Sequence, residues 1–231
     1  RASMIINADD LGRNKTATDR GLHCHRESRV TAASAMVFME DSARAAELTK
    51  TLLAISRKGK IISTAINLQE IVNATIEIAR HTLDRQITIE TDITDEAIDV
   101  TGDPGQLQNA ILNLLINARD AISGPGRIRI SLHSDQLDDV YCRSGKLNLT
   151  AGEFAVVTIE DDGCGIPDEI REKIFEPFFT TKKEGKGTGL GLSAVYGTVI
   201  SHHGAIKVES ETGAGSRFTV YLPLSGKSHS S

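Results

Sequence analysis

The sequence has no tryptophan, and aromatic residues make up only 4% of its 231 residues. The core is therefore expected to consist of aliphatic side chains. No apolar run approaches the roughly 20 residues that a membrane-spanning helix needs. The apolar stretch in the opening RASMIINADDLG is too short for a signal peptide. These absences predict no membrane segment and a cytoplasmic location.

Cysteine is also scarce, and Cys24, Cys142 and Cys164 form neither a CxxC pair nor an even set. A disulfide framework is therefore not expected, which fits a reducing compartment. The net charge of −5 argues against a nucleic-acid partner. The hydrophobic content of 39% and the charged content of 25% are typical of a globular protein of one large or two small domains.

The chain mixes helical and strand patterns. Helices are expected over 67–83, from Pro104 to about Ile122 and over 190–202, and strands over 86–93, 127–133 and 154–160, with a polar loop through about Gly152. A hairpin of AIKVES and RFTVYLP closes the chain, so its two strands are antiparallel neighbours. This pattern predicts an α+β fold, a two-layer sandwich with helices on one face of a sheet. An N-terminal β-α-β-α fragment precedes it.

The helix QLQNAILNLLINARDAI, residues 106–122, carries a row of polar side chains. At about 100° per residue, Asn109, Asn113, Asn117 and Asp120 fall within an arc of roughly 80°, opposite the apolar residues. Amide and carboxylate oxygens are hard ligands that suit Mg²⁺. The alternative is an ordinary amphipathic helix, although asparagine is a poor helix former for a merely solvated face.

A second motif, DDGCGIP, follows the strand AVVTIE. Asp161 at the strand end can accept a hydrogen bond from an exocyclic amine such as that of adenine. Gly163 and Gly165 let a base lie against the backbone. The alternative is a plain Asp-Gly turn.

Two further motifs follow. The third motif is IFEPFFTTK, residues 174–182, in which three phenylalanines precede a basic loop that can fold over phosphates. The alternative is a turn in the core followed by a solvated loop. In GKGTGLGLSAVYG, residues 185–197, alternate glycines open an apolar helix and leave N–H groups free to face an anion. This glycine stretch matches neither a P-loop nor a dinucleotide fingerprint.

The four motifs, in this order, resemble the conserved boxes of the ATP-binding catalytic domain of sensor histidine kinases, whose fold group includes the gyrase, Hsp90 and MutL ATPases. The resemblance covers about residues 60–224 and implies a Bergerat-type fold that uses ATP and Mg²⁺. It implies Asn117 as the metal ligand with Asn113 assisting, Asp161 as the adenine ligand, and Lys182 or Lys186 at the γ-phosphate. The nucleotide-binding residues that it implies, with Phe178 as a third lid anchor, are Asn113, Asn117, Asp120, Asp161, Gly163, Gly165, Ile166, Phe175, Phe179, Thr180, Gly187, Thr188, Gly189, Leu190, Gly191 and Leu192.

Within the fold group that the chain resembles, the residue at one position distinguishes kinases from ATP-hydrolysing enzymes. The ATPase relatives have a glutamate one turn before the metal-binding asparagine, where it activates water. Asn113 stands there in this chain. Because an amide cannot act as a general base, phosphoryl transfer is favoured over hydrolysis.

The N-terminal part of the chain carries two further resemblances, each to a different family segment. The helix at 43–61 is similar to the second helix of the phosphotransfer hairpin in the same kinases, but the expected phosphoacceptor box is missing; the nearest candidates are His23 and His25, which otherwise read as surface histidines. The stretch from IINADDLG to about residue 48 resembles the start of YdjC-like carbohydrate deacetylases, which implies Asp9 as base and Asp10 as metal ligand. The chain leaves that pattern too early to close a barrel, so we interpret it as a non-functional remnant.

The expected organisation is a YdjC-like fragment at 1–45, a hairpin-like helix at 43–61, a histidine kinase catalytic domain at 62–225 and a tail at 226–231. The expected function is transfer of the γ-phosphoryl group of Mg-ATP to a histidine, from which a response regulator receiver domain takes it. The expected partners are that regulator, a phosphoacceptor hairpin in cis or in trans, and a second copy through the hairpin helix. The alternatives are an ATP-binding interaction module that transfers nothing and a remnant of a metal-dependent deacetylase.

Overall fold

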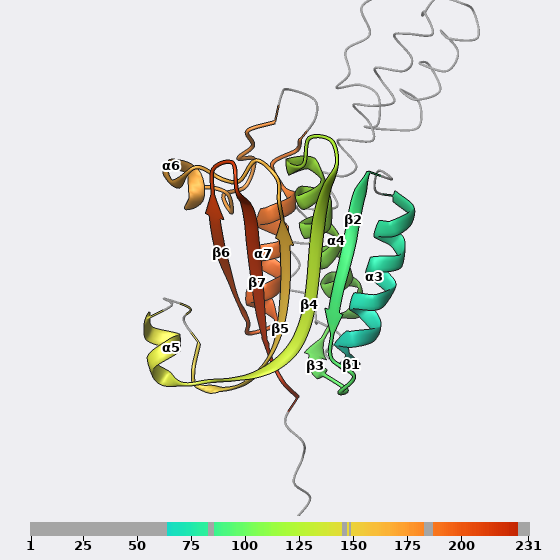
Figure 1. The fold of residues 1–231 in the computed structure, drawn as a ribbon. Coiled ribbons are helices and arrows are strands. Elements are labelled where there is room, and N and C mark those ends of the chain that lie inside the picture. The colour runs from blue at the N-terminus through green and yellow to red at the C-terminus, as the bar shows by residue number, and fades with distance from the viewer. Residues whose placement is uncertain (1–63, 83–85, 145–146, 148, 183–186, 226–231) are drawn as a thin grey trace, which may run out of the picture. The chain divides into compact units, whose positions relative to one another are not determined.

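The structure, a computed structural model, describes residues 64–82, 86–144, 147, 149–182 and 187–225 (Figure 1). The chain divides into two compact units, Arg1–Arg57 and Lys58–Ser231, and all the described residues belong to the second. None of the helices in this described part is long and apolar enough to cross a membrane.

Several predictions from the sequence fall on other residues. The fragment at 1–45 with its Asp9–Asp10 pair, the helix at 43–61, the tail at 226–231 and Lys186 all lie outside the described residues.

A five-stranded sheet forms one layer of the described unit. Its strand order is β2-β4-β5-β7-β6. The first pair, β2 with β4, is parallel, and the remaining pairs are antiparallel. The expected closing hairpin is confirmed as β6 and β7. The five strands are β2 (Ile87–Ile93), β4 (Gly126–Leu137), β5 (Gly152–Asp161), β6 (Ala205–Glu211) and β7 (Gly215–Pro223).

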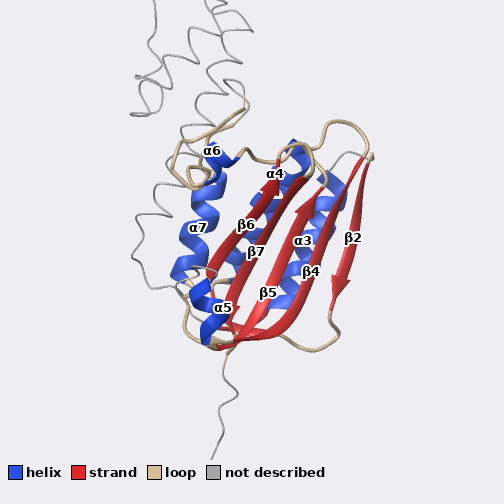
Figure 2. Cartoon of the chain, turned by 60° about the vertical axis from the view of Figure 1, so that its left-hand side comes forward, coloured by secondary structure: helices blue, strands red, loops and turns tan. Residues whose placement is uncertain are grey.

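Three helices cover one face of this sheet (Figure 2). They are α3 (Leu68–Thr82), α4 (Pro104–Ala121) and α7 (Gly191–Ser201). A separate two-stranded sheet pairs β1 (Thr64–Asn67) with β3 (Asp99–Gly102). The predicted α+β sandwich with helices on one face is therefore confirmed.

The helix α4 begins where the sequence indicates. Asp103 is the N-cap residue, and its carboxylate accepts a hydrogen bond from the main-chain N–H of Gln106 at 3.0 Å. Pro104 follows at the first helical position, where a missing N–H costs nothing. The helix therefore starts at a fixed point, which in turn fixes where its asparagines lie.

The core lies between the sheet and the helices. Alternate residues of each strand face it, as the period of two requires. One side of α3 is buried, and so is the apolar side of α4 that lies opposite its asparagines. Fully buried members of this core include Leu68, Val72, Leu114, Leu115, Ile128, Ile130, Leu132, Val157, Ile159 and Val195.

The expected polar loop before Gly152 is only partly a loop. Strand β4 continues to Leu137, and a short helix, α5 (Asp139–Ser144), follows it. The reason is a second apolar cluster on the outer face of the sheet, which gives β4 and α5 something to pack against. Its members are Leu137, Cys142, Leu147, Phe154, Val156, Ala205 and Tyr221.

Candidate nucleotide-binding site

The asparagine row of α4 meets the glycine stretch that opens α7. Asn113 and Asn117 are half-buried, whereas Asn109 is exposed. A Cβ built at Gly191 would lie 3.7 Å from both Asn113 Oδ1 and Asn117 Nδ2. The first and last motifs are thus in van der Waals reach of each other, although they lie far apart in the sequence.

Asp120 and Asn117 share a cation. The Lys182 ammonium donates to Asp120 Oδ2 at 2.6 Å and to Asn117 Oδ1 at 3.4 Å, and Arg119 pairs with the other Asp120 oxygen at 2.6 Å. Burial alone would raise the pKa of the Asp120 carboxyl. The hydrogen bonds and charges of Lys182 and Arg119 outweigh it and hold this pKa below its ordinary value.

Asp161 ends strand β5 and is only 6% exposed. Its Oδ1 accepts a hydrogen bond from the main-chain N–H of Gly163 at 2.9 Å. Burial raises the pKa of this carboxyl above its ordinary value, and the hydrogen bonds from the Gly163 and Ser216 main chain reduce that shift only in part. A buried acceptor with a fixed orientation is what recognition of a base amine requires.

The loop after Asp161 is pressed against two other elements. At Gly163 a Cβ would lie 2.7 Å from the carbonyl of Ala121, at the end of α4. Gly165 has a φ of +69°, and a Cβ there would lie 2.0 Å from the Glu211 carbonyl oxygen. Only glycine combines this backbone angle with such close contact, so the second motif is a tightly built turn and more than a plain Asp-Gly turn.

Gly189 joins the glycine stretch to the phenylalanine motif. Its φ is +67°, and a Cβ would lie 2.4 Å from the carbonyl carbon of Phe178. The Phe178 N–H donates to the Gly189 carbonyl at 2.9 Å. The two ends of the basic loop are therefore held together by main-chain contact.

The three phenylalanines of the third motif differ in their burial. Phe175 and Phe179 pack against the core, as an anchoring role requires, and the Phe175 ring lies 5.6 Å from that of Tyr196. Phe178 is 57% exposed and has a φ of 68°. Its side chain therefore does not pack in the core with the other two, and the contribution of Phe178 comes from its main chain.

The remaining predicted residues line the same region. Ile166 and Leu192 pack against the core, and Leu190 is 3% exposed. Thr180 Oγ1 accepts from the Lys182 N–H at 3.1 Å, and a Cβ at Gly187 would lie 2.8 Å from that oxygen. Thr188 Oγ1 accepts from the Leu190 N–H at 3.4 Å. Thr180 and Thr188 thus bond within the loop and are exposed.

Residues outside the four motifs support the loop that follows Asp161. Ser210 on β6 accepts a hydrogen bond from the Ile166 N–H at 2.7 Å and bonds to Gly215 and Ser216. Arg171, which ends the short helix α6 (Asp168–Arg171), pairs with Asp168 and donates to the Ser210 carbonyl at 2.7 Å. No motif marks these residues, because their role depends on a sheet neighbour brought in by the hairpin.

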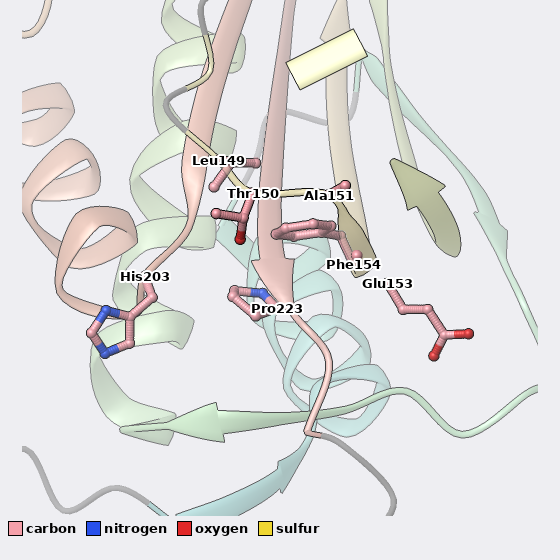
Figure 3. A pocket seen from close by; sticks show the side chains of 8 residues that line it. Leu149, Thr150, Ala151, Glu153, Phe154, His203 and Pro223 are labelled. Carbon is pink, nitrogen blue, oxygen red and sulfur yellow. The ribbon is translucent and has the colours of Figure 1, made fainter. Parts of the chain in front are cut away.

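A separate pocket lies at the opposite end of β5 and β7 (Figure 3). Its volume is about 360 Å³, and Phe154, Pro223 and His203 are among its lining residues. It contains none of the four motifs. The described residues also hold no group of three or more His, Cys, Asp and Glu side chains that suits a metal ion.

The four motifs therefore meet around the end of α4, the start of α7 and the end of β5, which is the arrangement of a nucleotide-binding domain. The chain belongs to the histidine kinase-, DNA gyrase B- and HSP90-like ATPase family, whose profile matches residues 102–226. Within that family it resembles sensor kinases.

Two relatives and one solved structure illustrate the similarity. Sensor kinase CckA of Brucella abortus (strain 2308) is 35% identical over 207 residues, which cover 90% of this chain and 22% of that protein. Sensor histidine kinase ZraS of Salmonella typhi is 29% identical over 218 residues, covering 92% and 43%. The structure of the mycobacterial sensor histidine kinase MprB has a TM-score of 0.57 and 29% identity, and the match covers 71% of this chain and 98% of that one. The chain spans less than half the length of these two curated relatives.

Proposed function

We propose that this domain binds Mg-ATP and transfers the γ-phosphoryl group to a histidine in two-component signalling. The sensor kinases among its relatives support the reaction class. The observation that carries the proposal is the convergence of Asn117 Oδ1 and Asp120 Oδ2 on one cation, the Lys182 ammonium. A cluster that already binds a cation beside a glycine turn suits a metal-nucleotide complex.

The residues fit Mg²⁺, because amide and carboxylate oxygens are the hard ligands that this ion takes in nucleotide sites. Asn117 would hold the ion with Asp120 beside it, and the ion would neutralise charge on the phosphates. Asn113 lies one turn earlier on the same helix. Since its amide cannot take a proton from water, the site favours transfer to an acceptor over hydrolysis.

Asp161 would hold the adenine amine. Its carboxylate is buried, so little water competes for it, and the Gly163 N–H fixes one of its oxygens. Lys182, and Lys186 in the same basic loop, would supply positive charge to the phosphates. Positioning and charge neutralisation are what phosphoryl transfer needs most from a protein.

The acceptor is proposed to be a histidine on a phosphotransfer hairpin, in cis or in trans, and a receiver domain would take the phosphoryl group from it. A cytoplasmic location and a homodimer through the hairpin helix belong to the same proposal. The sequence shows no phosphoacceptor box, so the acceptor has to be supplied in a test.

The test incubates the chain with Mg²⁺ and γ-labelled ATP, alone and with a separate phosphotransfer hairpin from a sensor kinase. Nucleotide binding is measured in parallel. We expect tight binding in both mixtures and acid-labile label on the added hairpin. The matched control is Asp161→Asn, which keeps the side-chain shape and is expected to weaken nucleotide binding and to reduce the label.

Each of the other outcomes would indicate a different function for this domain. Acid-labile label on the chain itself would identify an internal acceptor, with His23 and His25 examined first. Binding without label in either mixture would make the domain an ATP-binding interaction module. Failure to bind nucleotide would overturn the proposal.

A further inference from the structure

We propose that His202 is a positioning residue of the nucleotide site, because its ring joins the end of α7 to the residue that caps α4. The inference rests on the proposed function. It adds a residue that lies outside all four motifs.

His202 is 5% exposed, and both of its ring nitrogens have partners. The main-chain N–H of Asp103 donates to Nε2 at 2.9 Å, and Nδ1 lies 2.7 Å from the carbonyl oxygen of Thr198. Because the Asp103 amide can only donate, Nε2 is the acceptor. The neutral ring then carries its proton on Nδ1 and donates it to Thr198.

The surroundings of the ring are built to hold it. A Cβ at Gly102 would lie 2.2 Å from His202 Cδ2, so the ring occupies space that only a glycine leaves. Asp103, which the ring holds by its main chain, caps α4 with its side chain. The imidazole is therefore hydrogen-bonded to Asp103, the residue at which α4 begins.

Helices α4 and α7 run in opposite directions and touch at both ends. At one end, the Cβ position of Gly191 lies 3.7 Å from Asn113 and Asn117. At the other end, His202 bonds to Asp103. The helix α7 has 11 residues and His202 follows it directly, so at a rise of about 1.5 Å per residue the two contact points lie about 16.5 Å apart. If α7 shifts as a rigid body at His202, Gly191 shifts with it.

The contact between these ends is apolar. Val195 and Val199 of α7 belong to the same core as Leu107 and Leu114 of α4. Apolar packing has no preferred direction, and packed helices can slide by small shear movements. A hydrogen bond to a fixed main-chain N–H is directional. His202 therefore sets how far α7 lies along α4, and with it the spacing between the glycine turn and the asparagines.

Two amide substitutions separate the two bonds of the ring. In His202→Gln the side-chain oxygen reaches the position of Nε2 and keeps an acceptor for Asp103. In His202→Asn the shorter amide reaches only the position of Nδ1 and keeps a donor for Thr198. His202→Leu removes both bonds.

The readout is the affinity of the full chain for Mg-ADP, measured well below its unfolding temperature. We expect His202→Gln to bind within about twofold of the unmodified chain, and His202→Asn and His202→Leu to bind about tenfold more weakly, the usual effect of losing one buried hydrogen-bond partner. The matched control is Val199→Ala, which removes buried apolar atoms from the same helix. It is expected to lower the melting temperature and keep the affinity.

Equal affinities for the Gln and Asn variants, or an equal loss in Val199→Ala, would overturn the inference, because stability would then explain the effect. Hydrogen exchange of the Ala194 amide, which bonds to the Leu190 carbonyl at 2.9 Å in the first turn of α7, needs no nucleotide. Faster exchange in the Asn and Leu variants than in the Gln variant supports the inference, and equal rates contradict it. If the unmodified chain does not bind Mg-ADP, the proposed function fails, and the exchange rates still decide the role of His202.

Discussion

The Lys182 ammonium lies 2.6 Å from Asp120 Oδ2 and also reaches Asn117 Oδ1. A cation of the protein itself thus sits on the oxygens that we assign to the metal. The ammonium and Mg²⁺ would compete for these oxygens, because two cations cannot share them without repulsion.

The first prediction concerns this competition. Lys182→Met is expected to lower the Mg²⁺ concentration that half-saturates ADP binding by up to about fivefold, the size of a partly exposed ion pair. ADP isolates the effect, because it lacks the γ-phosphate that Lys182 would contact. The matched control is Lys207→Met: both lysines pair with a carboxylate and both side chains are 33% exposed. A higher Mg²⁺ requirement in Lys182→Met would show that the ammonium assists the nucleotide and does not compete with the metal.

The second prediction separates binding from stability at Asp161. Asp161→Asn is expected to weaken nucleotide binding about tenfold or more, since the new NH₂ would face the adenine amine as a second donor. The same change is expected to raise the free energy of unfolding at pH 7. Because burial raises the pKa of Asp161 in the folded chain, its ionisation opposes folding above that pKa.

The pH dependence of this second effect has a definite sign. As the pH falls through the raised pKa, the carboxyl of the unmodified chain becomes protonated and the stability advantage of Asp161→Asn disappears. Chemical unfolding of both chains across acidic and neutral pH measures it. A variant that is less stable at pH 7 would show that the charge of Asp161 supports the fold.

The third prediction compares two glycines with positive φ. Gly165→Ala places a Cβ 2.0 Å from the Glu211 carbonyl oxygen, whereas a Cβ at Gly213, with a φ of +83°, meets nothing within 4 Å. Gly213→Ala is therefore expected to cost about 1–2 kcal/mol of stability from backbone strain alone, and Gly165→Ala at least about 1–3 kcal/mol more from overpacking. Urea unfolding of both variants measures the difference, and equal losses would contradict the close contact at Gly165.

The fourth prediction concerns the end of α7. His203 has a φ of 58°, and the following Gly204 N–H bonds to the Val199 carbonyl at 2.9 Å, which is the pattern that usually places glycine at this position. His203→Gly is expected to raise the melting temperature, with a gain of roughly 0.5–1 kcal/mol. The control is His203→Ala, which keeps the strained angle and is expected to give no gain. A gain of the same size in both would remove strain as the cause.

The sequence predicts the parts of this fold that depend on long, regular patterns. Helix α4 has a capping aspartate, a proline and a continuous apolar stripe, so its start and its polar face are both predictable. The β1–β3 pair has four residues in each strand, too few for a periodic signal, and depends on pairing such as that of Thr64 with Gly102. Helix α5 depends on an apolar cluster to which the strands β4, β5, β6 and β7 all contribute.

In the candidate site, too, local patterns are predictable from the sequence and contacts between distant residues are not. The motifs identify Asp120 and Lys182 separately, yet these residues are 62 positions apart, and nothing local predicts their contact. His202 has no motif at all, because its partners are a helix carbonyl and a main-chain amide 99 positions away. Sequence patterns thus indicate which residue types a nucleotide needs, and tertiary packing decides which of them hold the others in place.

The exposed thiol of Cys164 lies in the loop between Gly163 and Gly165, while Cys142 is buried. Thiol reagents modify accessible cysteines in preference to buried ones. In a chain with Cys24 replaced by serine, a maleimide dye would therefore attach mainly beside Asp161. The labelling rate, compared with and without a test compound, would act as a footprinting assay for screening pocket ligands.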